Sequence, residues 1–412
     1  MSVKKIKMGV MGADRGRIVL MCEEFLHEEM EVTALMEKNE TLLQSLREQG
    51  ILKDSVKLYE DFDEFIHSGI DAVMLCNYFH EHTEYAIKAM EAGVAVLSET
   101  TAAPSLGECV KLVEAAEKTG IKYMLGANTL YFRVVREMKK IVDEKKYGEP
   151  VFADAEYVHP ADKKEYIAGL SDAVDVNNLH WRNTLPRCYY NMHDLGPMMY
   201  IFGKRPKRVI GKAVVLNNRS SDTITDHEKA FALVEMEDGS VINYSGCTRA
   251  GSLGKWYRVA CKYGTVESVR FNEAEDKIIE NGINEPITRD LTWSGAGSLT
   301  VEEEQRFGGG SAEFEHRTHG GLDLILIMDF LKYLRGESVP PYDVYGAVDL
   351  SAVAIMAWYS ALSDSKPMDI PDFRNKADRD KFRSDFRMPF AKRLSDVTLP
   401  VTVESGKGFK AF

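Results

Sequence analysis

Short apolar runs alternate with amphipathic stretches over the first third of the chain. Five runs have the length and composition of β-strands and cover residues 5–12, 32–36, 71–77, 94–98 and 122–125. The stretches between them repeat apolar residues at helical spacing and cover residues 15–29, 40–50, 83–92 and 106–118. Because strands alternate with helices, the pattern predicts parallel βαβ units in a doubly wound sheet.

The pattern changes near residue 148, after which strand-like runs follow one another directly. Residues 229–236 and 241–246 flank Asp238-Gly239, and an Asp-Gly pair between alternating runs indicates a β-hairpin. A further pair of strands is expected on either side of Tyr263-Gly264. Successive hairpins predict an antiparallel sheet, and two helical stretches follow it at residues 322–334 and 344–362.

These patterns predict an α/β chain with two domains and a tail. An N-terminal Rossmann domain with a doubly wound parallel sheet is expected at residues 1–128. An α+β domain with a large, mainly antiparallel sheet is expected at residues 129–373. Residues 374–412 are highly charged and are expected to form a tail that packs on the body, rather than a partner-binding arm.

The net charge and the spacing of the cysteines argue against several classes of protein. The chain has 52 basic and 64 acidic residues and a net charge of −12, which argues against general binding of nucleic acid. It has no uncharged run of the ~18 residues that a membrane span needs. The six cysteines are scattered without a CxxC pair. We therefore expect a cytoplasmic protein with no nucleic-acid partner, no membrane and no metal held by cysteines.

The turn after the first strand reads Gly12-Ala13-Asp14-Arg15-Gly16 and opens a helix. It matches a dinucleotide-binding glycine turn imperfectly, because Asp14 stands near the middle glycine and the loop is one residue short. Glu37 ends the second strand, where a carboxylate can accept hydrogen bonds from ribose hydroxyls and disfavours a 2′-phosphate. The context predicts NAD in preference to NADP; the alternative is a plain strand–turn–helix with Glu37 on the surface.

Several segments together resemble the glucose–fructose oxidoreductase/inositol dehydrogenase (Gfo/Idh/MocA) family. Residues 71–75 and 82–93 resemble its fourth strand and the following helix. Glu99 stands where the family has its Glu-Lys-Pro motif, and Asn128 lies where its sixth strand ends. His193, ten residues before Gly203, resembles its active-site histidine. The resemblance implies a Rossmann domain, a nicotinamide cofactor, no metal, and a homo-oligomer, dimer or tetramer, formed through the C-terminal sheet.

The departures from this family point to one of its branches. The family lysine is Thr100 here, and its two aspartates fall at Tyr189 and Gly196. The segment from Tyr190 to Pro197 resembles the Tyr-x-x-His-x-x-Gly-Pro segment of a branch that includes NAD-dependent α-N-acetylgalactosaminidases. Those glycosidases keep NAD bound, oxidise the sugar transiently, eliminate the aglycone, add water and reduce the product. The resemblance implies either net dehydrogenation or such a redox-neutral cycle.

The candidate catalytic residues are His193 and Tyr190. Removing the proton of a hydroxyl group needs a base, and an unperturbed imidazole titrates near neutrality. If the segment is helical, Tyr190 lies on the same face as His193 and can share this role. The alternative is that His193 is a satisfied polar residue at a domain junction.

The other candidate residues fall into two sets. Those expected to bind the cofactor are Gly12, Ala13, Asp14, Arg15, Gly16, Glu37, Asn77, Tyr78, His82, Glu99, Thr100 and Asn128. Those expected to bind the substrate are His180, Trp181, Arg182 and His319. For the second set, a core tryptophan with a salt-bridged arginine and a helix-capping histidine are the alternatives.

We therefore predict an NAD(P)-dependent oxidoreductase that transfers hydride from or to a carbohydrate or polyol hydroxyl. Two alternatives stay open. One is the redox-neutral, NAD-assisted glycosidase or lyase, and the other is a non-catalytic sensor that binds a dinucleotide. The absence of the family lysine motivates both.

Overall fold

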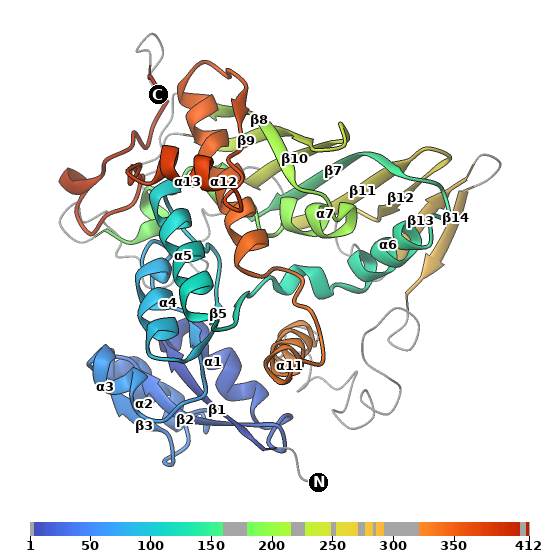
Figure 1. Cartoon of the computed structure of the whole chain (residues 1–412). Helices are drawn as coiled ribbons and strands as arrows, with labels where there is room; N and C mark the ends of the chain where they lie inside the picture. Colours follow the sequence, from blue (N-terminus) through green and yellow to red (C-terminus); the bar gives the residue numbers. More distant parts are fainter. Residues whose placement is uncertain are drawn as a thin grey trace. The chain divides into compact units, whose positions relative to one another are not determined.

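The computed structural model describes residues 4–159, 179–215, 227–248, 253–270, 277–282, 286–291, 321–403 and 409–411. The chain forms two compact units, and both can be followed in Figure 1. The first unit comprises Met1–Ala103, Lys111–Tyr131 and Gly297–Ala347. The second comprises Pro104–Val110, Phe132–Ala296 and Val348–Phe412.

The first unit is built on a six-stranded parallel sheet. Its strands are β1 (Ile6–Met11), β2 (Met30–Met36), β3 (Lys57–Tyr59), β4 (Ala72–Leu75), β5 (Ala95–Ser98) and β6 (Tyr123–Leu125). Their order is β3-β2-β1-β4-β5-β6, so the strand order reverses between β1 and β4. Every residue of β4 and β5 is buried, as expected for a sheet covered on both faces. The doubly wound parallel sheet predicted from the sequence is confirmed.

Helices follow most of these strands. They are α1 (Ala13–Cys22), α2 (Glu40–Glu48), α3 (Phe62–Ile66), α4 (His82–Glu91) and α5 (Leu106–Thr119). The Asn39 and Asp61 side chains accept the backbone N–H groups that open α2 and α3. The helix predicted over residues 15–29 is shorter in the structure. It ends at Cys22, and the Glu23 carboxylate then turns inward to accept the Val32 N–H at 3.3 Å.

A helix from far along the chain completes the first unit. Helix α11 (Leu322–Arg335) packs against α1 and against the 3₁₀ turn Asn128–Tyr131. The Lys122 ammonium donates to the carbonyls of Tyr333 and Leu334 in its last turn, at 2.5 and 3.1 Å. The sequence pattern had placed this helix in the second domain, because an apolar face does not reveal which sheet it covers.

The second unit is built on a nine-stranded sheet. Its strands are β7 (Pro150–Val158), β8 (Pro206–Val215), β9 (His227–Met236), β10 (Val241–Thr248), β11 (Gly254–Cys261), β12 (Gly264–Ser268), β13 (Lys277–Asn281), β14 (Pro286–Asp290) and β15 (Met368–Asp369). Their order is β14-β13-β12-β11-β7-β10-β9-β8-β15. The β7–β10 pair is parallel and the other pairs are antiparallel. The predicted large, mainly antiparallel sheet is confirmed.

One face of this sheet is covered by helices. Helix α7 (Leu195–Phe202) packs against β7 and β10 in its middle, and helix α6 (Arg133–Asp143) lies beside α7 and packs against β12, as Figure 1 shows. Helix α12 (Val344–Leu362) lies over β8, where the Gly211 N–H donates to the Ser360 hydroxyl at 2.9 Å. Helix α12 is long and apolar enough to cross a membrane, but 89% of its apolar window is buried. It is therefore a core helix of the kind common in globular proteins.

Along each strand, side chains that point to the helix-covered face alternate with side chains that point to the opposite face. Phe152, Phe231 and Leu233 lie on it and are each more than a third exposed. Leu233 lies beside Ile210 on one side and Asn243 on the other. This surface, called the open face below, therefore carries a row of apolar groups between its charged ones.

The charged C-terminal segment packs on the second unit. It includes the short helix α13 (Lys376–Phe382), which begins at the side-chain cap of Asn375. The buried Trp358 donates its indole N–H to the carbonyl of Pro400 at 2.8 Å. The Arg374 guanidinium pairs with the buried carboxylate of Asp349 at 3.0 Å.

Candidate functional site

The predicted site residues fall into two clusters, one in each unit. The first cluster lies at the carboxyl ends of β1, β2, β4, β5 and β6, where doubly wound sheets bind their ligands. The second cluster is aromatic and lies between β7 and the start of α7. His319 lies outside the described residues.

The turn between β1 and α1 is as tight as its sequence suggested. Gly12 has a φ of +89°, and a Cβ atom there would lie 2.6 Å from the carbonyl oxygen of Cys76. Helix α1 begins at the next residue, so its free N–H groups surround this turn. Asp14 and Arg15 are exposed, so their charges can turn away from a bound phosphate. The missing Cβ lets the turn lie against the backbone that follows β4, and the helix N-terminus can receive a pyrophosphate, so the turn fits a dinucleotide.

Glu37 is fixed beside this turn by three backbone N–H groups. One carboxylate oxygen accepts from Ala13 at 2.8 Å. The other accepts from Lys38 at 2.8 Å and from Asn39 at 2.9 Å. A carboxylate has further lone pairs on both oxygens, so Glu37 can still accept from ribose hydroxyls. Its placement supports the acceptor role that the sequence predicted for it.

The residues predicted for the other half of the cofactor follow β4, β5 and β6. The Glu99 N–H donates to the carbonyl of Leu75 at 2.9 Å, which joins the ends of β4 and β5. Asn77 donates to the Glu81 carboxylate at 3.3 Å, and Tyr78 beside it is exposed. Thr100 is buried. Asn128 donates to the carboxylate of Asp323 on α11 at 3.3 Å.

His82 is buried rather than open to a ligand. Its Nδ1 lies 2.9 Å from the carbonyl oxygen of Thr101, and its Nε2 lies 3.2 Å from that of Asn77. Burial lowers the pKa of His82, and the hydrogen bond to Thr101 opposes that shift. The ring therefore links the loops that follow β4 and β5. A direct contact between His82 and the cofactor stays a prediction.

Two residues of the first cluster were not among the sequence-predicted site residues. Cys76 follows β4, and its thiol has a raised pKa, first because of burial and then because of Glu99 and Asp323, while Arg15 opposes the shift. Asp323 is buried in the first turn of α11. Asp323 lies 195 residues after Asn128, so no local pattern in the sequence indicated that the two side chains meet.

The aromatic cluster of the second unit is centred on His193. The Tyr157 ring meets the His193 ring edge to face with centroids 4.7 Å apart, and the Tyr190 ring does so at 5.1 Å. The segment is a turn rather than a helix, because α7 begins only at Leu195. Tyr190 and His193 are nevertheless in ring contact, as the sequence spacing suggested. Tyr157 was not a predicted site residue, since it lies more than 30 residues away in sequence.

Buried polar groups hold the backbone around His193. The Tyr257 hydroxyl donates to the His193 carbonyl at 2.6 Å, and the Asn191 amide donates to the Leu350 carbonyl at 2.9 Å. The Asp194 carboxylate accepts the Leu195 N–H at 2.8 Å and so caps α7. Burial raises the pKa of Asp194 well above its ordinary value. These hydrogen bonds therefore hold in place the turn that carries the His193 imidazole.

The predicted substrate residues extend the same cluster. His180 and Trp181 stack with centroids 5.5 Å apart, and Trp181 stacks on Tyr190 at 6.2 Å. The Arg182 guanidinium lies 4.6 Å from the Trp181 ring centroid and 5.7 Å from that of Tyr190. Trp181 is half-buried and therefore not a core tryptophan. These side chains, with His193, present stacked rings and donors of the kind that bind sugars.

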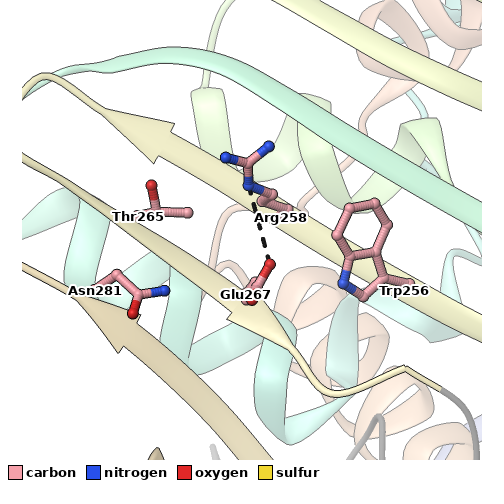
Figure 2. A pocket seen from close by; sticks show the side chains of 5 residues that line it. All are labelled: Trp256, Arg258, Thr265, Glu267 and Asn281. Carbon is pink, nitrogen blue, oxygen red and sulfur yellow. Dashed lines mark ion pairs between the residues drawn. The ribbon is translucent and has the colours of Figure 1, made fainter. Parts of the chain in front are cut away.

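Metal-binding groups and cavities bear on what further chemistry the described residues can carry. Within the described parts of the chain, no group of three or more His, Cys, Asp or Glu side chains could hold a metal ion. A shallow depression of about 460 Å³ lies on the open face of the second sheet, lined by Trp256, Arg258, Thr265, Glu267 and Asn281. Figure 2 shows Arg258 and Glu267, which form an ion pair at 3.9 Å. This depression shares no residue with either cluster.

Comparison with known families assigns both ends of the chain. Residues 6–127 match the family model for the Gfo/Idh/MocA oxidoreductase family, NAD-binding Rossmann fold. Residues 308–378 match the model for the C-terminal domain of glycosyl hydrolase 109. The first match covers the predicted cofactor residues except Asn128, and the second covers α11 and α12.

Relatives and solved structures agree with these matches. A glycosyl hydrolase family 109 protein of Stenotrophomonas maltophilia is 23% identical over 90% of this chain and 89% of its own length. An α-N-acetylgalactosaminidase of Tannerella forsythia is 22% identical over 76% of this chain and 73% of its own length. A levoglucosan dehydrogenase in complex with NADH is 17% identical, covers 90% of this chain and 100% of its own, and has a TM-score of 0.71. The structural likeness shows the fold.

Proposed function

Residues 6–127 match the NAD-binding Rossmann domain of the Gfo/Idh/MocA oxidoreductase family, and from this premise we propose that the chain uses NAD to oxidise and reduce a carbohydrate hydroxyl group. The observation that carries the proposal is the aromatic cluster, in which two tyrosine rings flank the imidazole of His193. The cluster supplies a proton acceptor and stacked rings, and the NAD-binding domain supplies the cofactor site. Oxidising a sugar alcohol needs all three.

The first cluster would hold the cofactor. Gly12 and the N-terminus of α1 would bind its pyrophosphate, Glu37 its adenosine ribose, and Glu99 with Asn128 its nicotinamide half. NAD, when bound, supplies the hydride acceptor for the reaction. We propose NAD in preference to NADP, because the Glu37 carboxylate would repel a 2′-phosphate at that position.

His193 would accept the proton of the sugar hydroxyl. Its ring is held edge-on by Tyr157 and Tyr190, so its position is set before a substrate binds. The family lysine that would share this work is Thr100 here. The proton transfer would therefore depend on His193, with the Tyr190 phenol as its neighbour.

A second candidate is the redox-neutral cleavage of a glycosidic bond. It is supported by the match of residues 308–378 to a glycosyl hydrolase domain, and by a relative named as an α-N-acetylgalactosaminidase. In this reaction the sugar is reduced again at the end of each turnover. No NADH would then accumulate, while an aglycone would be released.

The first experiment measures cofactor and turnover together. The purified protein is denatured to quantify released NAD, and the native protein is assayed with 4-nitrophenyl glycosides and free sugars. NADH accumulation would support net oxidation, and release of 4-nitrophenol without NADH would support the glycosidase. We expect His193→Ala to lower kcat/KM by about 10²- to 10⁴-fold, the range of general acid–base catalysis.

The matched control is His27→Ala, because His27 is an exposed histidine of the first unit. It should leave turnover unchanged. Unchanged turnover in His193→Ala would contradict the catalytic assignment. A protein that binds the dinucleotide but turns over none of the sugars would support the non-catalytic sensor instead.

A further inference from the structure

Asp323 reaches the nucleotide-binding unit from the C-terminal half of the chain. It lies in the first turn of α11, and its residue is only 3% exposed. Its Oδ1 accepts a hydrogen bond from the Asn128 amide at 3.3 Å. Asn128 lies three residues after the end of β6, and α11 packs against the turn that Asn128 begins. The carboxylate is therefore fixed against the end of β6.

The electrostatic reach of Asp323 extends to neighbouring elements. Burial raises the pKa of the Cys76 thiol after β4, and Glu99 and Asp323 raise it further, while Arg15 lowers it. Burial also raises the pKa of Cys22 in α1, and Asp323 adds to that shift. Glu99 and Asp323 are therefore the two carboxylates that act on the Cys76 thiol at the end of β4, and Arg15 offsets part of their effect.

The sheet topology assigns this region to one half of the cofactor. The strand order reverses between β1 and β4, and dinucleotides lie across that reversal. Gly12 and Glu37 mark the β1–β2 side as the adenosine half. The nicotinamide half therefore belongs over β4, β5 and β6, which are followed by Asn77, Glu99 and Asn128.

We propose that Asp323 is a positioning residue that holds Asn128 for the nicotinamide half and favours NAD⁺ over NADH. This inference rests on the cofactor binding proposed above. The nicotinamide ring carries a positive charge in NAD⁺ and none in NADH. A buried carboxylate in a medium of low dielectric constant stabilises the charged form, whereas a purely structural link to Asn128 would affect both forms equally.

The test compares the dissociation constants of NAD⁺ and NADH for the full chain and for Asp323→Asn. The amide keeps the shape of the side chain and removes its charge. We expect the preference for NAD⁺ to fall on the order of 10-fold, because one unit charge is lost within several ångströms. Such a change raises the midpoint potential of the bound couple by about 30 mV. An equal change in both constants, or none, would overturn the inference.

Asp329→Asn is the matched control, because Asp329 lies on the same helix, six residues beyond Asp323. It should leave the ratio of the two constants unchanged. The exchange Asn128→Asp with Asp323→Asn keeps a carboxylate in the same hydrogen bond, so it keeps the inference testable if Asp323→Asn does not fold. We expect this exchange to retain most of the preference for NAD⁺, and its loss would contradict the proposal.

The outcome is independent of the sugar chemistry. A protein that binds NAD⁺ and NADH with the expected ratios but oxidises and cleaves no sugar would refute the proposed function alone. A protein that turns over sugar with an unchanged ratio in Asp323→Asn would refute this inference alone.

Discussion

At the scale of a single residue, Glu37 both holds the backbone by hydrogen bonds and places a negative charge at the proposed ribose position. Its carboxylate accepts three backbone N–H groups and so fixes the start of α1 against the end of β2. The same negative charge faces the position where the adenosine ribose would bind. A substitution at Glu37 that removes the charge but keeps a hydrogen-bond acceptor can therefore separate the effect of charge from the effect of hydrogen bonding.

We predict that Glu37→Gln relaxes the preference for NAD over NADP by on the order of 10-fold, because the amide no longer repels a 2′-phosphate. The NAD affinity itself should change less than the NADP affinity. The measurement is the pair of dissociation constants for NADH and NADPH. Glu31→Gln is the control, since Glu31 is an exposed carboxylate near the opposite end of β2; an equal relaxation in both variants would contradict the role of Glu37.

Candidate site residues could be chosen from the sequence where a residue follows a strand. Glu37, Glu99 and Asn128 could be chosen because the carboxyl ends of parallel strands meet at one edge. Tyr157 and Asp323 could not be chosen in this way. Their partners His193 and Asn128 are distant in sequence, so only the folded backbone brings each pair together.

The β1–α1 turn determines at the scale of an element whether a cofactor can bind. Its φ of +89° and the closeness of the Cys76 carbonyl leave no room for a side chain at Gly12. Gly69 has nearly the same φ, +90°, but nothing lies within 4 Å of a Cβ atom there. An alanine at Gly69 therefore tests backbone strain alone, whereas an alanine at Gly12 tests the same strain together with a steric clash.

We predict that Gly69→Ala destabilises the protein by about 1–2 kcal/mol, the cost of a left-handed conformation for a residue with a Cβ atom. Gly12→Ala should cost about 1–3 kcal/mol more, because the Cβ atom also collides with the backbone after β4. Only Gly12→Ala should weaken NAD binding. Urea unfolding and cofactor titration of both variants measure this, and equal effects at the two positions would refute the clash.

Most strands of both sheets could be predicted from the sequence, whereas some of the pairs that these strands form could not. Hairpin signals predicted neighbours such as β9 and β10 because those strands are joined by a short turn. They could not predict that β10 pairs in parallel with β7, because the two strands are far apart in sequence. Long-range pairing depends on which faces are covered, which no local pattern contains.

At the scale of the whole molecule, the open face of the second sheet is the main unexplained surface. Ile210, Leu233 and Asn243 lie side by side on neighbouring strands, and Phe152 and Phe231 extend the apolar area. The ion pair between Arg258 and Asp154, at 3.3 Å, continues the row on β11 and β7. We propose that a second copy of the chain covers this face.

We predict that Leu233→Arg weakens self-association by at least about 100-fold, because it would bury an unpaired charge in the interface. Val339→Arg is the control, since Val339 is 89% exposed and lies outside this face. Sedimentation of both variants and of the unmodified chain over a range of concentrations gives the oligomeric state. A monomer at all concentrations, or an unchanged oligomer in Leu233→Arg, would refute the proposal.

Because α11 packs on the first unit, the order in which the chain is synthesised affects when that unit can complete its folding. Residue 131 ends the second segment of that unit, and α11 begins at Leu322. At ~5–20 residues per second, a ribosome needs roughly 10–40 s to synthesise the chain between them. During that interval the surfaces of α1 and of the Asn128 turn that α11 covers would face solvent or a chaperone. The nucleotide-binding half, although made first, is completed only after strands β7 to β14 of the large sheet have been synthesised.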